Sequence, residues 1–405
     1  MGHGLDQYGP ARKDATAQLL LLIARDVLSD QQTSKMHALS EQVTDWHEFV
    51  SLCLRNAGLP FAYKHMSAIL HEKLEPAVLL ELKARALRQT MDAMKLSAAM
   101  AQFHRDCLEP ISADYFFMKG PALGMQYYRD AALRTSCDVD VLVSQSDFSK
   151  VARLALEKDY RFLFQTEEGD FATKSQDLDF LIRHSECISA FNADGIHFEI
   201  HRHIEKTTPI FPTDEILSAS ETVKFGRATI RTMPTAWHFV YITYHHSRHF
   251  WSRLHWIADL HALMSHQTFD RNAVLALARR IGLLPTVQAA MEFADLTDKA
   301  DIWPDALGVT PAGIFLDAAL RGLPGDHAFE LESWDAMFLF DFGDEWQFDK
   351  KKKYLFWAQS AWRRLKPNEH QYQQQPRKRS LEWLYTLENI GTLGGNLLKR
   401  IGFQS

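Results

Sequence analysis

The stretch that decides the fold is residues 115–143, which read YFFMKGPALGMQYYRDAALRTSCDVDVLV. Residues 115–118, YFFM, form a short aromatic-rich run that stops at Lys119-Gly120, and this pattern predicts a buried strand. Residues 121–128 follow as a predicted helix, because proline is accepted in the first turn of a helix. The β-branched content of residues 138–143, DVDVLV, predicts a second strand. The order is therefore strand, helix, strand.

The alternation of strands and helices continues downstream. Residues 146–158 are predicted to form a helix, with a serine and an aspartate at its start as available caps. Strands are expected at residues 188–191 and 196–204. Between them lies Asp194-Gly195, a dipeptide that strongly favours a hairpin turn.

Helical periodicity flanks this α/β stretch on both sides. Leu19, Leu20 and Ile23 illustrate the three- and four-residue spacing that runs to about residue 108, and similar spacing returns after Pro234. A chain of 405 residues also exceeds what one hydrophobic core usually serves. We therefore expect an N-terminal helical region (1–108), an α/β core (109–234) and a C-terminal helical region (235–405).

Carboxylates gather on the predicted strands. Alternate side chains share one face of a strand, so Asp138 and Asp140 point the same way about 7 Å apart. In residues 196–204 one face carries His197, Glu199, His201 and His203, and the other carries Ile196, Phe198, Ile200 and Ile204. If the two strands are neighbours, Glu199 completes a cluster of three carboxylates.

Such a cluster needs a cation, because three converging negative charges repel one another. Mg²⁺ or Mn²⁺ is the expected cofactor, since hard cations prefer oxygen ligands. Gly120 opens a helix where a phosphate could approach backbone N–H groups, and Arg134 could clamp a phosphate. A lone DxD pair is usually a solvated strand edge. The ordered set of strand, Lys119-Gly120, helix, arginine, DVD strand and glutamate strand is far more specific.

These motifs carry a family resemblance. Residues 118–143, MKGPALGMQYYRDAALRTSCDVDVLV, and residues 197–204, HFEIHRHI, resemble a bacterial family of nucleotidyltransferases related to the polymerase-β fold. Trp46 and residues 252–260, SRLHWIADL, also match helical signatures of that family. The resemblance covers roughly residues 40 to 265. It implies an α+β fold with a small mixed β-sheet nucleotidyltransferase core flanked by N- and C-terminal helical regions.

The resemblance implies roles for particular residues. Asp138, Asp140 and Glu199 would be the catalytic metal ligands, and Gly120 would belong to a phosphate loop. The reaction would move a nucleoside monophosphate from an NTP such as ATP to an acceptor and release pyrophosphate. Two departures stand out: the broader superfamily has Gly-Ser or Gly-Gly where this chain has Lys119-Gly120, and Cys137 stands where serine is common.

The remaining nucleotide-binding candidates come from the residues themselves. We expect Lys119, Gly120 and Arg134 to hold the triphosphate, and we expect His201 to support the metal ligands. Arg253 is a further candidate, since it lies in a histidine-rich segment that could line the cleft.

Two alternative functions stay open. The first is a nucleotide-binding or scaffold protein that keeps the fold without turnover. The second is a metallohydrolase that uses the histidine-rich helix 245–261, where His245 and His249 are four residues apart, as are His255 and Asp259. Against the second alternative, the glutamate of an HExxH motif is missing.

Net charge, the N-terminal sequence and the cysteines indicate which partners and which cellular compartment to expect. A net charge of −6 gives no strong nucleic-acid signal, although a basic run lies at residues 350–353. The N-terminus has no signal-peptide pattern and no apolar run long enough to span a membrane, and the four cysteines are scattered, so we expect a cytoplasmic protein. The acceptor stays open among a small molecule, a sugar phosphate, a protein and an RNA end.

Overall fold

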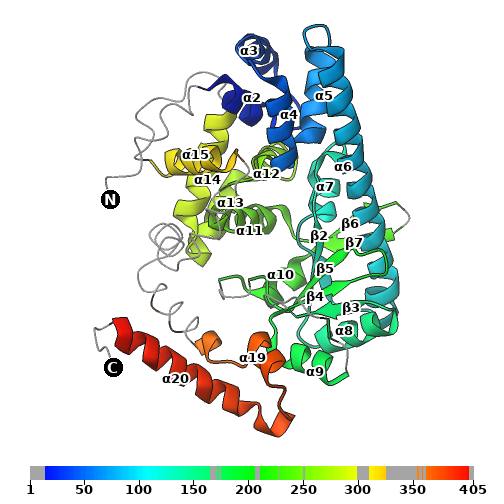
Figure 1. The fold of residues 1–405 in the computed structure, drawn as a ribbon, viewed down its shortest axis with the longest axis vertical. Helices are drawn as coiled ribbons and strands as arrows, with labels where there is room; N and C mark the ends of the chain where they lie inside the picture. The colour runs from blue at the N-terminus through cyan, green and yellow to red at the C-terminus, as the bar shows by residue number, and fades with distance from the viewer. Residues whose placement is uncertain are drawn as a thin grey trace. The chain divides into compact units, whose positions relative to one another are not determined.

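The computed structural model describes residues 14–164, 171–172, 175–205, 210–226, 228–249, 251–298, 310–324, 354, 358 and 362–400. The basic run at 350–353 lies outside these residues. Helices and one mixed seven-stranded sheet make up the described chain, which confirms the predicted α+β class (Figure 1). Within it, no helix combines the length and apolar character needed to cross a membrane.

The chain divides into two compact units, each assembled from three segments. The first unit comprises residues 1–97, 120–136 and 234–349, and the second comprises 98–119, 137–233 and 350–405. A single long helix, α6 (Pro76–Phe103), runs from the first unit into the second.

The first unit is helical, and polar caps begin several of its helices. Asp14 accepts a hydrogen bond from the backbone of Ala17, and Ser29 and Gln32 form a reciprocal capping box. Gly282 ends one helix in the left-handed conformation that favours glycine. Besides the start of α6, the helices are α2 (Ala15–Ile23), α3 (Asp30–Ser40), α4 (Trp46–Arg55), α5 (Leu59–Ile69), α7 (Pro121–Tyr127), α11 (Thr235–Arg248), α12 (Leu254–Met264), α13 (Arg271–Ile281), α14 (Leu284–Asp298) and α15 (Pro311–Gly322).

The second unit is built on the sheet, whose strand order is β3-β4-β5-β2-β1-β7-β6. The central pair β2–β5 is parallel, as is β1–β7, and the other neighbouring pairs are antiparallel. The strands are β1 (Tyr115–Phe117), β2 (Asp138–Val143), β3 (Arg161–Leu163), β4 (Cys187–Phe191), β5 (His197–His201), β6 (Glu221–Phe225) and β7 (Ala228–Thr232).

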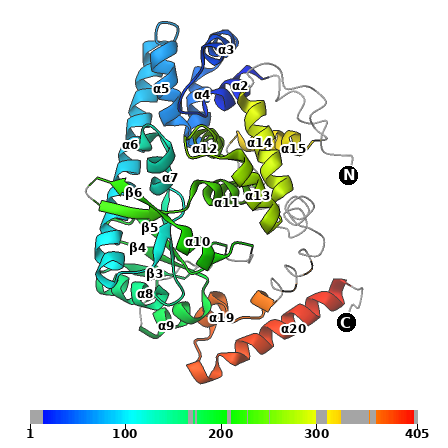
Figure 2. The same cartoon turned by 180° about the vertical axis from the view of Figure 1, so that it is seen from behind.

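Helices and turns fix the second unit around this sheet. Helix α8 (Phe148–Glu157) packs against β5 and against α9 (Ser175–His184), and the same elements are seen from behind in Figure 2. Gly195 has φ +76° in the hairpin that joins β4 to β5, so the predicted Asp-Gly turn is confirmed. The unit also contains α10 (Thr213–Ala219), α19 (Glu369–Gln374) and α20 (Trp383–Arg400).

The C-terminal segment is tied to α9 by polar contacts. Glu382 pairs with Arg183 and lies 2.8 Å from the Nε2 of His184. The hydroxyl of Tyr372 donates to Asp177 at 3.0 Å, and its ring stacks on Phe180. These contacts make residues 369–385 an integral part of the second unit.

Candidate active site

The central strands bring three predicted acidic residues together. In the parallel pair β2–β5, Asp138 is opposite His197 and Asp140 is opposite Glu199. The expected adjacency of the two strands is therefore observed, and alternation places these carboxylates on one face of the sheet. On the other side of β2, the backbone N–H of Met118 donates to the carbonyl of Asp140 at 3.1 Å, which anchors the strand bearing both aspartates.

The three carboxylates form a compact oxygen-rich group. One oxygen each from Asp138, Asp140 and Glu199 lies within 4.8 Å of the others. Asp140 is fully buried, and its Oδ2 atom has no hydrogen-bond partner among the described residues. A buried carboxylate oxygen without a donor is costly, and a cation would satisfy it. The donor set therefore fits a hard divalent cation such as Mg²⁺ or Mn²⁺.

Lys119 provides a positive charge to this group. Its Nζ atom lies 3.2 Å from Asp140 Oδ1, and the lysine side chain is only 16% exposed. Burial disfavours the charged form of Asp140, but Lys119 and the hydrogen bond with His201 outweigh it and lower the pKa of Asp140. Asp140 is therefore ionised at neutral pH.

Asp138 shows the opposite behaviour. Burial, followed by the negative charge of Asp140, raises the pKa of Asp138 above its usual value. The two carboxylates thus repel each other when both are ionised. Lys119 offsets only one of their two negative charges.

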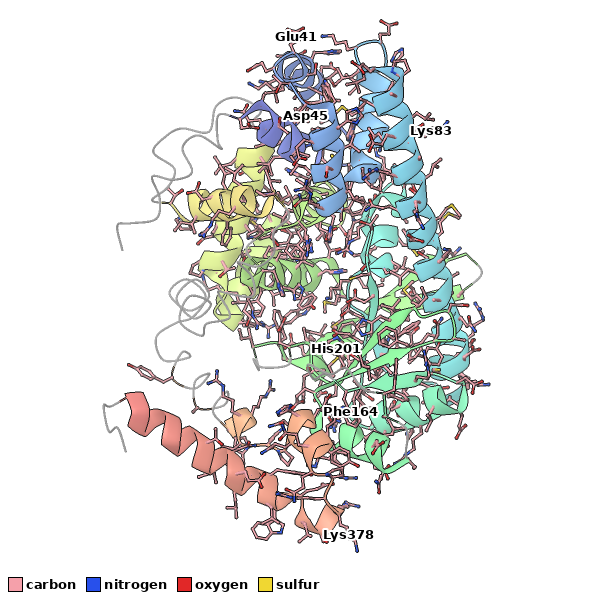
Figure 3. All side chains as sticks on the ribbon, in the orientation of Figure 1. Glu41, Asp45, Lys83, Phe164, His201 and Lys378 are labelled. Atoms are coloured by element: carbon pink, nitrogen blue, oxygen red, sulfur yellow. The ribbon has the colours of Figure 1, made fainter. Side chains whose placement is uncertain are left out.

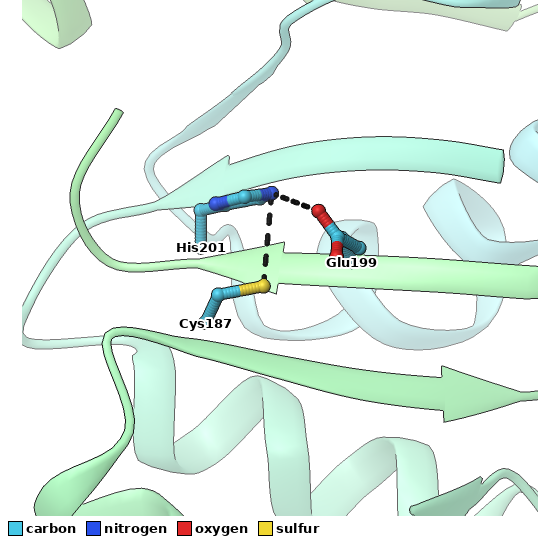
Figure 4. A group of neighbouring side chains, drawn as sticks. All are labelled: Cys187, Glu199 and His201. Atoms are coloured by element: carbon cyan, nitrogen blue, oxygen red, sulfur yellow. Dashed lines mark hydrogen bonds and ion pairs between the residues drawn. The ribbon is translucent and has the colours of Figure 1, made fainter. Parts of the chain in front are cut away.

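His201 sits at the meeting point of several side chains. Its Nε2 atom lies 3.2 Å from Glu199 Oε2 and 3.7 Å from the Sγ of Cys187 (Figure 4). The same atom lies 3.3 Å from Asp140 Oδ1. Burial disfavours the imidazolium, but Cys187 and the two carboxylates raise the pKa of His201 well above its usual value. Figure 3 labels His201 among the side chains of the sheet.

Three further candidates, Gly120, Arg134 and Arg253, belong to the first unit. Gly120 precedes α7 with φ +62°, a conformation that glycine adopts without strain. Arg134 is buried, and its guanidinium donates to both carboxylate oxygens of Asp259, at 3.3 and 3.0 Å. Arg253 donates to the carbonyl of Arg55 at 3.2 Å.

The histidine-rich segment contains a different kind of centre. Asp259 accepts hydrogen bonds from Arg134 and, at 2.7 Å, from the hydroxyl of Tyr128. The rings of His245 and His249 lie with their centroids 4.8 Å apart. Among the described residues, two groups of side chains have the spacing for a metal ion, and neither includes His245, His249 or Asp259. The geometry here is that of a buried ion pair, not of a hydrolytic metal site.

Cys187 is a site residue that sequence reasoning did not select. It lies one position before the strand predicted at 188–191, and β4 pairs it directly opposite His201. It is buried, with no disulfide. The sequence could have indicated Cys187 through the hairpin. Counting pairs outward from a turn at Asp194-Gly195 places Cys187 opposite His201.

The site residues follow a simple order along the chain. Lys119 ends the segment after β1, the paired aspartates follow on β2, and an acidic residue with a histidine lies on β5. No curated protein matches the chain. A sequence model of the family described as "uncharacterised nucleotidyltransferase" matches residues 42–297, more than half of the chain, and the protein belongs to this family.

Proposed function

We propose that the protein is a metal-dependent nucleotidyltransferase that moves a nucleoside monophosphate from an NTP to an acceptor hydroxyl or phosphate. The acceptor oxygen forms a bond to the α-phosphorus, and the bond from that phosphorus to the bridging oxygen breaks. Pyrophosphate leaves. Family membership supports the transfer chemistry, and the carboxylates of Asp138, Asp140 and Glu199 support the metal dependence.

The three carboxylates would hold Mg²⁺ or Mn²⁺. Their oxygen donors suit a hard cation, and the unpartnered Oδ2 of Asp140 is the observation that carries the assignment. When bound, such an ion polarises phosphate oxygens and offsets the negative charge that develops on the leaving group.

Three residues of the site would have separate roles in the reaction. Glu199, whose side chain is 17% exposed, would accept the proton of the acceptor hydroxyl. Lys119 holds Asp140 ionised and would bind a phosphate oxygen of the NTP. His201 orients Asp140 and Glu199 through its Nε2 atom.

The contacts proposed for the first unit belong to the same hypothesis. Gly120 would leave room for a phosphate beside the first N–H groups of α7, and Arg253 would bind the nucleotide or the acceptor. For Arg134, the pairing with Asp259 is the role that its geometry supports, and its contact with triphosphate stays a prediction.

The test is nucleotide binding by titration calorimetry with ATP, GTP, CTP and UTP, in the presence of Mg²⁺ or Mn²⁺ and in EDTA. We expect one NTP to bind with metal and to lose binding in EDTA and in the double variant Asp138→Asn/Asp140→Asn. Asp179→Asn is the matched control, because Asp179 lies in the same unit but pairs with Arg153 on the surface. Absence of binding by folded wild-type protein contradicts the proposal.

A further inference from the structure

A second set of metal-ligand atoms lies on the same face of the sheet. The Sγ of Cys187, the Nε2 of His201 and a carboxylate oxygen of Glu199 lie within 4.8 Å of one another (Figure 4). Cys187 belongs to β4, and the other two residues belong to β5. The antiparallel register pairs Cys187 with His201, so both side chains stand side by side on this face.

The spacing of these atoms matches the edges of a zinc tetrahedron. With Zn–S of about 2.3 Å and Zn–N and Zn–O of about 2.0–2.1 Å, tetrahedral angles give S···N of about 3.6 Å and N···O of about 3.4 Å. The observed S···N distance between Cys187 and His201 is 3.7 Å. The observed N···O distance from His201 Nε2 to Glu199 is 3.2 Å.

Three ligand-type atoms surround one ring nitrogen of His201. The Nε2 atom carries one proton or one lone pair, so it can serve a single strong partner. The other ring nitrogen, Nδ1, is buried without a hydrogen-bond partner among the described residues. Among the described residues, the ring's polar contacts are therefore directed through Nε2, the nitrogen that would bind the ion.

The chemistry of the group selects a transition metal over magnesium. A thiolate and an imidazole are soft or borderline ligands, which favour Zn²⁺, whereas Mg²⁺ prefers oxygen alone. The carboxylate oxygen of Glu199 makes a three-ligand set, and a water molecule would take the fourth position of a zinc tetrahedron. Cys187 and His201 are 3% and 4% exposed, so the ion would lie in a largely dry setting, with Glu199 on the more open side.

We propose that Cys187, His201 and Glu199 bind one zinc ion in tetrahedral geometry, with water as the fourth ligand. Binding forms Zn–S and Zn–N bonds, and the thiol proton of Cys187 and the Nε2 proton of His201 pass to solvent. The proposal stands apart from nucleotidyl transfer, because it requires no nucleotide. Since Glu199 also belongs to the oxygen group with Asp138, zinc at this position withdraws one ligand from Mg²⁺, and we expect zinc to weaken metal-dependent NTP binding.

Cobalt(II) is the probe for this site, because a Co²⁺–thiolate bond produces an intense near-ultraviolet charge-transfer band that oxygen ligands do not give. Metal-free full-length protein is titrated with Co²⁺ and then with Zn²⁺. We expect the band to saturate at one Co²⁺ per chain and to disappear when Zn²⁺ displaces it. Co²⁺ binding without the band, or no Co²⁺ binding at all, overturns the proposal in wild-type protein alone.

Two cysteine variants locate the sulfur ligand. Cys187→Ser is expected to remove the band and to weaken zinc binding by roughly tenfold or more. Cys137→Ser is the matched control, because Cys137 is exposed and directly precedes Asp138, yet lies outside the ligand group. Loss of the band in Cys137→Ser, or its persistence in folded Cys187→Ser, refutes the assignment.

The variant Asp138→Asn separates this proposal from the proposed function. Asp138 is absent from the zinc ligands, so the Co²⁺ band is expected to persist in this variant while Mg²⁺-dependent NTP binding falls. A wild-type protein that gives the band but binds no NTP contradicts only the nucleotidyltransferase proposal. One that binds NTP with Mg²⁺ but gives no band contradicts only the zinc site.

Discussion

Arg134 and Asp259 form a buried ion pair within the first unit. Replacing Arg134 alone tests whether the arginine stabilises the fold or binds nucleotide. The side chains are 3% and 0% exposed. Arg134 Nη2 lies 3.0 Å from one carboxylate oxygen, and Nε lies 3.3 Å from the other. Arg134→Met removes the guanidinium but keeps most of the apolar stem, so the change is mainly one of charge and hydrogen bonding.

The expected loss of folding free energy comes from the Asp259 carboxylate, which stays buried without its partner. Arg134, with a hydrogen bond from His246, holds the pKa of Asp259 well below its usual range against the opposing effect of burial. Without the arginine, a buried carboxylate loses its main counter-charge, and such a loss costs about 3–5 kcal/mol of folding free energy. The variant also removes the hydrogen bond from Nη1 to the carbonyl of Thr135, worth about 1 kcal/mol. We therefore expect a loss of about 4–6 kcal/mol.

The assay is urea unfolding at pH 7, followed by tryptophan fluorescence, with Trp251 and Trp256 as reporters in the same unit. The double variant Arg134→Met/Asp259→Leu removes both charges, so we expect it to regain at least about half of the loss. If Arg134→Met costs less than about 1 kcal/mol but abolishes NTP binding, the ion pair is not its main role, and a triphosphate contact explains it better.

Three further expectations concern other residues. Burial lowers the pKa of His65 to about 4, so between pH 6.5 and 4 the unfolded chain alone takes up a proton there. The free energy of unfolding should fall by up to about 3 kcal/mol across that window, and His65→Gln should lose this part of the pH dependence in urea titrations. Gly322→Ala should destabilise the protein by about 1–3 kcal/mol in the same assay, because its Cβ would lie 2.6 Å from the Cα of Ser252, whereas Gly391→Ala meets nothing within 4 Å and should be neutral or stabilising. In EDTA, Asp138→Asn should raise the midpoint of thermal unfolding because it removes one of the converging charges, and an unchanged or lower midpoint would contradict the repulsion inferred from its raised pKa.

The local pattern of the sequence predicted the centre of the sheet. The β-branched run DVDVLV forms β2 at Asp138–Val143, the residues expected, and the Asp-Gly turn joins β4 to β5. The predicted helix at 121–128 is α7, which ends one residue earlier. The family resemblance is confirmed as well. These features depend on neighbours within a few residues, so the sequence alone carries them.

Other parts of the sheet depend on distant partners and were not predicted. Strand β6 is largely exposed at one edge of the sheet, and β7 beside it buries only Ile230 and Thr232, so neither has the strong apolar alternation of a half-buried strand. Strand β3 has only three residues. Short or exposed strands gain their pairing from the sheet itself, not from their own composition.

The same reasoning applies to side-chain contacts. Arg134 and Asp259 are separated by 125 positions, and no local pattern links an arginine before β2 to an aspartate in α12. Cys187 and His201 meet only through the register of the β4–β5 pair. The types of residue were visible in the sequence, whereas their partners required the fold.

The central claim is that Asp138, Asp140 and Glu199 bind a divalent cation, and Mn²⁺ binding measured by electron paramagnetic resonance tests it most directly. Free Mn²⁺ gives a strong solution signal that is lost on binding, so bound ions can be counted with and without NTP. The account predicts Mn²⁺ binding in wild-type protein, its loss in Asp140→Asn and its retention in His249→Ala. Mn²⁺ binding that survives Asp140→Asn but is lost in His249→Ala would contradict the account and move the metal to the histidine-rich segment.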